Sequence, residues 1–323
     1  MKKNVKIDDF LKDVKKLGIA GHVRPDGDCI GSCMGLYLYI KENYPHIESH
    51  VYMEKIMGKF DYIKDIDKVE NEISDTGFDL FISIDLSDRE RMAVAGEEFA
   101  KTEKTLCIDH HVSNTGFGLY NHVVPDASSS CEVLYDMLDE DKISRDTATA
   151  LYTGIIHDSG VFKYESTTEH TMNIAGKLMS LGVDFPAIID EGFYEKTYVQ
   201  NQILGRALLE SILLLDGKCI FSAVNKQEME FYGVTPSEMG GVVEQLRLTA
   251  GVECAIFMYE TAHMEYKVSL RSKKYVDCNA VAGYFGGGGH IRAAGCTLRG
   301  TVHDVVNNIL IHIEKQLKEK GLL

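Results

Sequence analysis

Four groups of acidic and histidine residues in the first half of the chain have the side chains that bind metal ions. Each group follows an apolar run. In chain order the groups are His22 with Asp26 and Asp28, then Asp85, then Asp109-His110-His111, and finally Asp158. Carboxylates and imidazoles gathered without cations repel one another and are costly to bury. Divalent cations remove this cost, so the groups together predict a site for a pair of metal ions.

Each group taken alone also has an ordinary structural explanation. A His-x-x-x-Asp sequence at the start of a loop is usually a solvated turn, and Asp85 after a strand would cap the next helix. The recurrence of the pattern favours the metal site, because all four groups stand at the end of an apolar element of one chain.

The elements that must position these groups alternate as in a parallel βαβ sheet. In an open parallel sheet the carboxyl ends of the strands line one crevice, so the four groups would converge there. We predict strands at 17–21, 51–53, 78–84 and 104–108, and helices at 31–42, 129–138, 145–156 and 168–181.

A second, smaller α+β domain is predicted in the last third of the chain, because Asp216-Gly217 between apolar runs is a strong hairpin signal. Its strands are predicted at 211–215, 218–225, 254–260 and 265–271, and its helices at 238–248 and 302–318. The predicted organisation is a metal-binding α/β domain at 1–188, a linker helix at 189–209, a substrate-binding domain at 210–323, and a cleft between the two domains.

Composition narrows the partners that the protein could have. The 323 residues carry a formal net charge of −15. Proteins that bind long nucleic acid usually have an excess of Lys and Arg, because these residues neutralise the phosphates. Long duplex DNA and a membrane surface are therefore not expected partners, and a small phosphorylated substrate stays open. The eight cysteines form no CxxC pair, and no apolar run approaches membrane-spanning length, so we expect a cytoplasmic protein.

The metal-binding groups carry a resemblance to a known family. His22-x-x-x-Asp26-x-Asp28 with Gly31-Ser32, then Asp85, Asp109-His110-His111 and Asp158, resemble the four signature motifs of the DHH phosphoesterases. Gly286-Gly-Gly-Gly289-His290, followed by Ala293-Ala294-Gly295, is similar to the motif of the DHH-associated C-terminal domain. In length and architecture the chain resembles the stand-alone bacterial nanoRNases and pAp-phosphatases, and also the stand-alone cyclic-dinucleotide phosphodiesterases.

The resemblance implies a role for each matching residue. His22 and Asp26 would bind one metal ion, Asp28, His110 and Asp158 a second, and Asp85 would bridge them. Asp109 would orient the histidines from behind, and His111 would donate a hydrogen bond or a proton at the scissile phosphate. The substrate-binding residues would be Arg271, Ser272, Gly287, Gly288, Gly289 and His290. The oxygen and nitrogen ligands suit manganese.

One position departs from the family pattern. His157 directly precedes Asp158, where many relatives have a threonine or another small residue. We expect His157 to pack beside the site or to support it rather than to bind a metal ion.

The function that the resemblance implies is metal-dependent hydrolysis of phosphate esters by activated water. The expected substrates are short oligoribonucleotides, cut from the 5′ end, and 3′-phosphoadenosine 5′-phosphate (pAp). The alternative is a phosphodiesterase acting on cyclic-di-AMP or on linear dinucleotides such as pApA and pGpG. A nucleotide-binding regulator without activity is disfavoured because every expected metal ligand is present. The sequence does not decide the oligomeric state, and a homodimer stays open.

Overall fold

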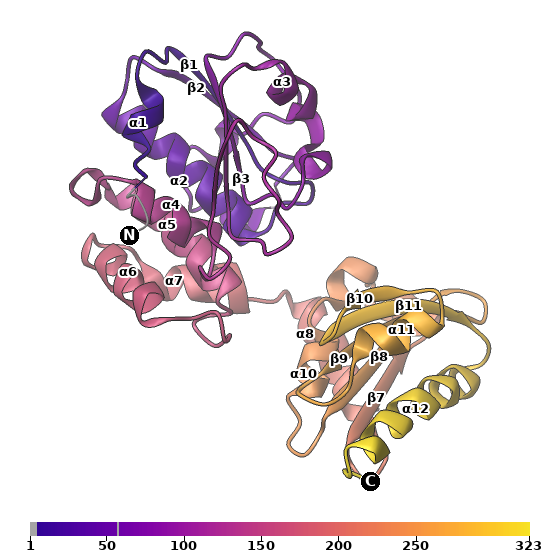
Figure 1. Ribbon diagram of the computed structural model, residues 1–323. Coiled ribbons are helices and arrows are strands. Elements are labelled where there is room, and N and C mark those ends of the chain that lie inside the picture. The colour runs from indigo at the N-terminus through magenta and orange to yellow at the C-terminus, as the bar shows by residue number, and fades with distance from the viewer. Residues whose placement is uncertain (1–4, 57) are drawn as a thin grey trace. The chain divides into compact units, whose positions relative to one another are not determined.

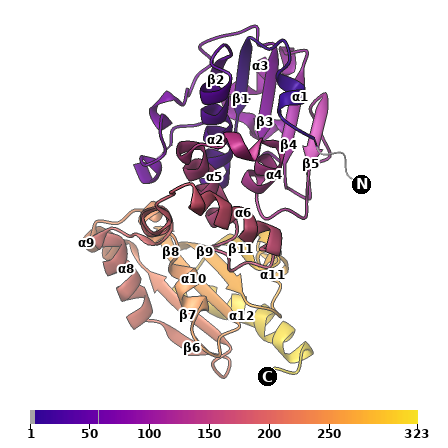
Figure 2. The same ribbon diagram turned by 90° about the vertical axis from the view of Figure 1, so that its left-hand side faces the viewer.

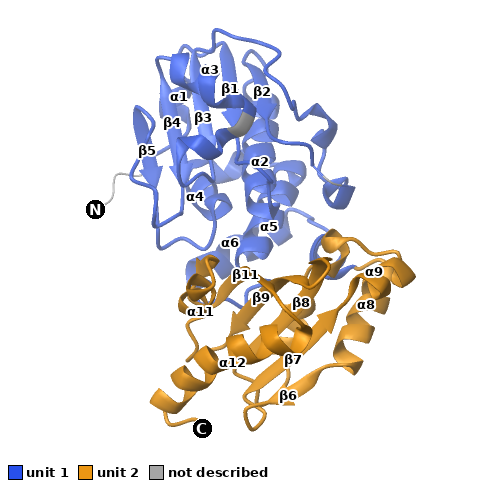
Figure 3. Ribbon diagram, turned by 90° about the vertical axis from the view of Figure 1, so that its right-hand side faces the viewer, with its two compact units in different colours: residues 1–195 blue, residues 196–323 orange. Residues whose placement is uncertain are grey.

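A computed structural model describes residues 5–56 and 58–323. The chain divides into two compact units, residues 1–195 and 196–323 (Figure 3). Each unit is built around its own sheet, and the predicted combination of a parallel α/β unit with a second α+β unit is confirmed. Within the described ranges, no helix is both long and apolar enough to span a membrane.

The first unit contains a five-stranded sheet of order β2-β1-β3-β4-β5, and every neighbouring pair is parallel (Figures 1 and 2). Its strands are β1 (Lys16–Ala20), β2 (Glu48–Tyr52), β3 (Leu80–Ile84), β4 (Thr105–Asp109) and β5 (Tyr120–Val123). All five residues of β3 and of β4 are buried. Such continuous burial is expected of central strands whose two faces are both covered.

Helices cover both faces of this sheet. The larger core lies between the sheet and α2, α4 and α5, whereas Phe81 and Tyr52 face a smaller core that includes Phe99 of α3. The helices are α1 (Asp8–Leu11), α2 (Gly27–Asn43), α3 (Gly96–Lys101), α4 (Ser130–Met137), α5 (Arg145–Asp158), α6 (Glu169–Ser180) and α7 (Phe185–Ile189). A π turn at Asp190–Tyr194 follows α7.

Glycines let α2 and α5 approach closely. A side chain at Gly31 would meet the backbone oxygen of Ala150 at 2.5 Å, and one at Gly154 would meet Asp28 Oδ1 at 2.6 Å. Only glycine fits at such distances. The contact matters for function because α2 carries Asp28 in its first turn and α5 ends on Asp158.

The second unit is a six-stranded mixed sheet of order β10-β11-β9-β8-β7-β6 (Figure 2). Only β7 and β8 are parallel. Its strands are β6 (Ile212–Leu214), β7 (Cys219–Val224), β8 (Cys254–Ala262), β9 (Glu265–Ser272), β10 (Gly288–His290) and β11 (Ala293–Arg299). Its helices are α8 (Tyr198–Leu209), α9 (Lys226–Tyr232), α10 (Val242–Arg247), α11 (Cys278–Tyr284) and α12 (Val302–Glu319).

Helices also cover both faces of the second sheet. Residues of α11 and α12 pack on one face, and residues of α8 and α10 pack on the other. Ile203 and Ala207 of α8 are fully buried there, so this helix is part of the second unit's core.

The eight cysteines are all free thiols, and all are buried. Each unit holds four of them: Cys29, Cys33, Cys107 and Cys131 in the first, and Cys219, Cys254, Cys278 and Cys296 in the second.

Candidate active site

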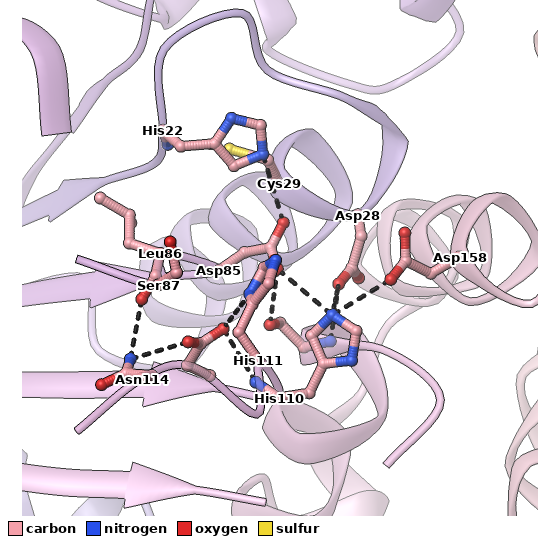
Figure 4. Close-up of polar contacts among 12 residues, drawn as sticks. His22, Asp28, Cys29, Asp85, Leu86, Ser87, His110, His111, Asn114 and Asp158 are labelled. Carbon is pink, nitrogen blue, oxygen red and sulfur yellow. Dashed lines mark hydrogen bonds and ion pairs between the residues drawn. The ribbon is translucent and has the colours of Figure 1, made fainter. Parts of the chain in front are cut away.

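The four metal-binding groups predicted from the sequence come together in the first unit. His22 follows β1, Asp85 follows β3, and the Asp109-His110-His111 triplet begins on the last residue of β4. Asp28 and Asp158 reach the same place from α2 and α5. Figure 4 shows the Asp85 carboxylate between His22 and His110.

Asp85 is the central residue of this cluster. Its side chain is 3% exposed, and its two oxygens face different imidazoles: Oδ2 lies 3.5 Å from His22 Nε2, and Oδ1 lies 3.6 Å from His110 Nε2. Its backbone φ of 65° is in the left-handed region, which is uncommon for a residue other than glycine. Strain of this kind collects at functional sites, where the surrounding structure holds it in place.

Asp28, His110 and Asp158 form one side of the cluster. His110 Nε2 lies 3.1 Å from Asp158 Oδ2 and 3.9 Å from Asp28 Oδ2. The fully buried Asp28 accepts backbone hydrogen bonds from Ser130 (2.6 Å) and Cys131 (3.0 Å) at the start of α4. These bonds hold the carboxylate in place against the end of a helix.

Ser130 is a site residue that the sequence analysis missed. Besides its backbone bond to Asp28, its hydroxyl donates to Asp85 Oδ1 at 2.9 Å. The predicted helix at 129–138 put Ser130 at an ordinary helix start, and Ser129 is indeed the N-cap of α4. Only the fold reveals that the next hydroxyl points at Asp85.

His22, Asp26 and Cys29 form the other side of the cluster. His22 Nε2 lies 3.7 Å from Asp26 Oδ2, and its Nδ1 lies 2.8 Å from the backbone oxygen of Val23. Asp26 also caps α2 by accepting the backbone N–H groups of Asp28 and Cys29. The Cys29 thiol lies close enough to join His22 and Asp85 as a third donor, which the sequence analysis did not consider.

Asp109 supports His111 rather than both histidines. It is fully buried, and its Oδ1 lies 2.8 Å from His111 Nδ1, whereas it contacts His110 only through the backbone N–H. Asn114, a second residue that the sequence analysis missed, donates to Asp109 Oδ2 at 2.7 Å. The sequence feature that could have identified Asn114 is its position three residues after the Asp109-His110-His111 triplet. The His111 side chain is 33% exposed, so its other ring nitrogen is available to a ligand.

The charges of the cluster are strongly perturbed. Burial opposes charge on His110, but Asp158 and Asp28 outweigh it and raise the pKa of His110 to about 10. For His22, too, burial is outweighed, here by Asp26 and Asp85, and its pKa is raised. Burial and the charges of Asp85 and Asp158 raise the pKa of Asp28 well above its usual range.

These residues fit divalent cations. In the described part of the chain no Lys or Arg pairs with the carboxylates of the cluster, and their ion-pair partners are histidines alone. The raised pKa values of His110, His22 and Asp28 have the same cause, which is a shortage of positive charge near the carboxylates. Bound cations would supply that charge. Three overlapping groups of donors lie close enough to hold an ion: Asp28 with His110 and Asp158, His22 with Cys29 and Asp85, and Asp85 with His110 and His111.

His157 packs beside the site. Its ring lies 5.4 Å from the Phe60 ring and 5.6 Å from the Phe193 ring, and a side chain at Gly27 would overlap it. Burial lowers the pKa of His157 to about 4, and its Nε2 has no hydrogen-bond partner among the described residues. It is therefore a neutral ring wedged between aromatic side chains.

In the second unit, Arg271 and His290 lie on the same face of the sheet. His290 pairs with Ala293 across β10 and β11, and Ala293 pairs with Arg271 across β11 and β9. Residues directly opposite each other in a sheet point to the same side, so the two side chains flank the small Ala293. His290 is exposed, and the Arg271 side chain is 34% exposed with Glu244 at 3.8 Å.

Ser272 does not share this exposure. It is 4% exposed, and its hydroxyl donates to the backbone oxygen of Val276 at 2.6 Å. The alternation of a strand explains the difference, because Ser272 and Arg271 must point to opposite faces of the sheet.

The glycine motif at 286–289 leads into a tight β hairpin. Gly288 and Gly289 belong to β10 and pair with Gly295 and Ala294 of β11. A side chain at Gly287 would meet the backbone oxygen of Gly295 at 2.2 Å, and Gly289 has a φ of 150°. The glycines are therefore needed for close strand packing, in addition to any approach of a phosphate.

Comparison with known proteins identifies the class. Residues 16–155 match the N-terminal domain of the DHH family, and residues 216–319 match the DHHA1 domain. The chain thus belongs to the DHH family, as its motifs predicted, and it is a hydrolase that acts on phosphate esters.

Its relatives include bacterial enzymes of matching length. The bifunctional oligoribonuclease and PAP phosphatase NrnA of Bacillus subtilis is 28% identical over 304 residues, which cover 92% of this chain and 93% of the relative. The protein of the same name from Thermus thermophilus is 26% identical over 98% of this chain and 94% of its own. An exopolyphosphatase-related protein from Bacteroides fragilis shares the fold, with a TM-score of 0.85 at 24% identity over 95% of this chain and 94% of that chain.

Proposed function

We propose that the protein hydrolyses short oligoribonucleotides from the 5′ end and removes the 3′-phosphate of pAp. The observation that carries this proposal is the cluster around Asp85, in a chain similar over nearly its whole length to enzymes named for both activities. All eight cysteines are free, which fits the reducing cytoplasm as the proposed compartment.

Two divalent cations, which we propose to be manganese, would be held on the two sides of Asp85. His22 and Asp26 would bind one, Asp28, His110 and Asp158 would bind the other, and Asp85 would offer one oxygen to each. When bound, such ions activate water and neutralise charge on the phosphoryl oxygens. Ser130 would keep the Asp85 carboxylate oriented, since its hydroxyl already donates to Oδ1.

His111 is our candidate for the hydrogen bond to the scissile phosphate. Asp109 accepts from its Nδ1, and the His111 side chain is 33% exposed. The same carboxylate raises the pKa of His111, which favours the protonated ring that can donate to a phosphate oxygen or to the leaving group. In the second unit, Arg271 and His290 would bind the part of the substrate that does not react, and Gly287, Gly288 and Gly289 would let the backbone approach it.

A product-resolved assay tests this function. Purified protein with Mn²⁺ is given pAp, pApA, 5′-labelled RNA of increasing length and cyclic-di-AMP, and Asp85→Asn protein prepared in parallel controls for contaminants. We expect phosphate from pAp and 5′-mononucleotides from short RNA, with activity falling beyond roughly ten nucleotides, because an acidic surface does not neutralise a long backbone. Turnover of cyclic-di-AMP without turnover of pAp and short RNA would replace the proposal with a dinucleotide phosphodiesterase.

A further inference from the structure

A second cluster of acidic and histidine side chains lies on the first unit, outside the site described above. We name it the β2 cluster, and its members are Glu48, His50, Glu70 and Asp75. Glu48 begins β2 and His50 is the middle residue of this strand, whereas the Asp85 cluster lies at the carboxyl ends of β1, β3 and β4. Glu70 is brought to the strand by a parallel bridge to Tyr52.

The contacts of His50 are those of a metal-binding imidazole. Its Nδ1 lies 2.7 Å from Glu70 Oε1, and its Nε2 faces Glu48 Oε1 at 3.2 Å and Asp75 Oδ2 at 3.7 Å. Metal-binding histidines commonly donate their second ring nitrogen to a carboxylate, which fixes the tautomer and the ring orientation. Tetrahedral zinc, with bonds of about 2.0–2.1 Å, needs donor atoms roughly 3.3–3.4 Å apart, and the two spacings at Nε2 bracket that value.

The surroundings hold these donors in place. The His50 ring stacks on Tyr52, with ring planes 6° apart. It also makes an edge-to-face contact with Phe78, with 5.7 Å between the two ring centroids. Lys16 binds the other oxygen of Asp75 at 2.5 Å, so Oδ2 stays turned toward His50. Preorganised donors of this kind separate a built site from a chance group of surface acids.

A buried hydroxyl beside the cluster also lacks a partner. Tyr52 is fully buried, and its hydroxyl has no hydrogen-bond partner in the described part of the chain. A buried hydroxyl without a partner calls for a ligand or an ordered water beside it.

The charge balance of the β2 cluster also favours a bound cation. The carboxylates of Glu48, Glu70 and Asp75 are opposed by the single ammonium of Lys16, which leaves two negative charges when the imidazole is neutral. A divalent cation balances them. We propose that Glu48, His50 and Asp75 bind a zinc ion, with Glu70 holding the imidazole from behind. The ion would fasten the segment before β3 to the start of β2. This site is independent of the proposed function.

The test counts zinc ions. Wild type, Glu48→Gln and His50→Gln are dialysed to equilibrium against Zn²⁺, and bound metal per chain is measured by mass spectrometry of the elements. Glu72→Gln is the matched control, because Glu72 is exposed on the same segment and lies outside the cluster. We expect each cluster variant to bind one zinc ion fewer than wild type and Glu72→Gln, with Mn²⁺-dependent turnover unchanged.

Two results would overturn the site. One is equal zinc content in all four proteins. The other is a loss in His50→Gln that Glu48→Gln does not reproduce, because the Glu48 side chain is 63% exposed and its amide should leave the fold intact. Circular dichroism of each variant confirms that folded proteins are compared.

Discussion

At the scale of single residues, Asp85 combines burial, a left-handed backbone and contacts to imidazoles on both sides. Ordinary structural roles do not require this combination, since a helix cap needs neither the burial nor the strain. The same scale explains why Ser130 and Asn114 escaped the sequence analysis. Their types are common in turns and caps, and only tertiary contacts turn their polar groups toward Asp85 and Asp109.

Asp85→Asn should abolish turnover on every substrate. The amide keeps the shape and tolerates the left-handed backbone, but it removes the charge that we propose to serve both cations. We expect a loss on the order of a thousandfold or more in kcat, with an unchanged circular dichroism spectrum. Exposed Asp126→Asn serves as the control. Activity above about a tenth of wild type would contradict the central role of Asp85.

His157 should make the metal-free protein sensitive to mild acid. In the unfolded chain this residue takes up a proton near pH 6.5, whereas in the fold its pKa is about 4. Between these values the unfolded state binds more protons, so stability falls as the pH is lowered, by at most about 3 kcal/mol. Thermal unfolding in chelator from pH 7.5 to 4 measures this loss. His157→Phe should flatten the curve in that window, and an equally steep curve would show that other groups cause it.

At the scale of elements, strongly patterned segments could be predicted and short irregular ones could not. The apolar runs of β1, β3 and β4 and the start of α5 at Arg145 were predicted to within two residues, because buried parallel strands and capped helices leave clear signals. The exposed strand β5 has no apolar run. The strands β10 and β11 are rich in glycine and alanine, so their pairing depends on tertiary contacts that sequence patterns do not encode.

Two adjacent glycines of this hairpin should respond differently to the same change. In Gly287→Ala the new methyl group meets the backbone of Gly295, so we expect a destabilisation of about 1–3 kcal/mol and weaker pAp hydrolysis. In Gly288→Ala the nearest atom is 3.8 Å away, and stability should change by less than about 0.5 kcal/mol. Thermal unfolding and steady-state kinetics test both. If Gly288→Ala loses activity at unchanged stability, that glycine serves the approach of a phosphate.

At the scale of the whole molecule, the chain separates its proposed chemical groups from its proposed binding groups. The metal-binding and catalytic candidates lie between residues 22 and 158, in the first unit, and Arg271 and His290 lie in the second. Binding energy gained far from the reacting phosphate serves to position it, so its loss should depend on how much of the substrate reaches the second unit.

Arg271→Ala and His290→Ala should therefore discriminate between substrates. We expect about a ten- to hundredfold loss of kcat/KM for pAp and pApA, the usual effect of removing a charge-assisted hydrogen bond. Bis-p-nitrophenyl phosphate should lose far less, because it occupies only the metal site. Arg299→Ala, whose side chain is 85% exposed, provides the control. Equal losses on the large and the small substrate would exclude a binding role.

The buried thiols allow the opening of each folded unit to be followed in solution. Since every cysteine is inside the folded protein and each unit holds four, a thiol-labelling reagent reaches them only when a unit opens. Peptide mapping after timed exposure would assign the modified cysteines to residues 29–131 or 219–296. The natural sequence thus carries two internal reporters, and the opening rate of each half can be read separately without introducing a probe.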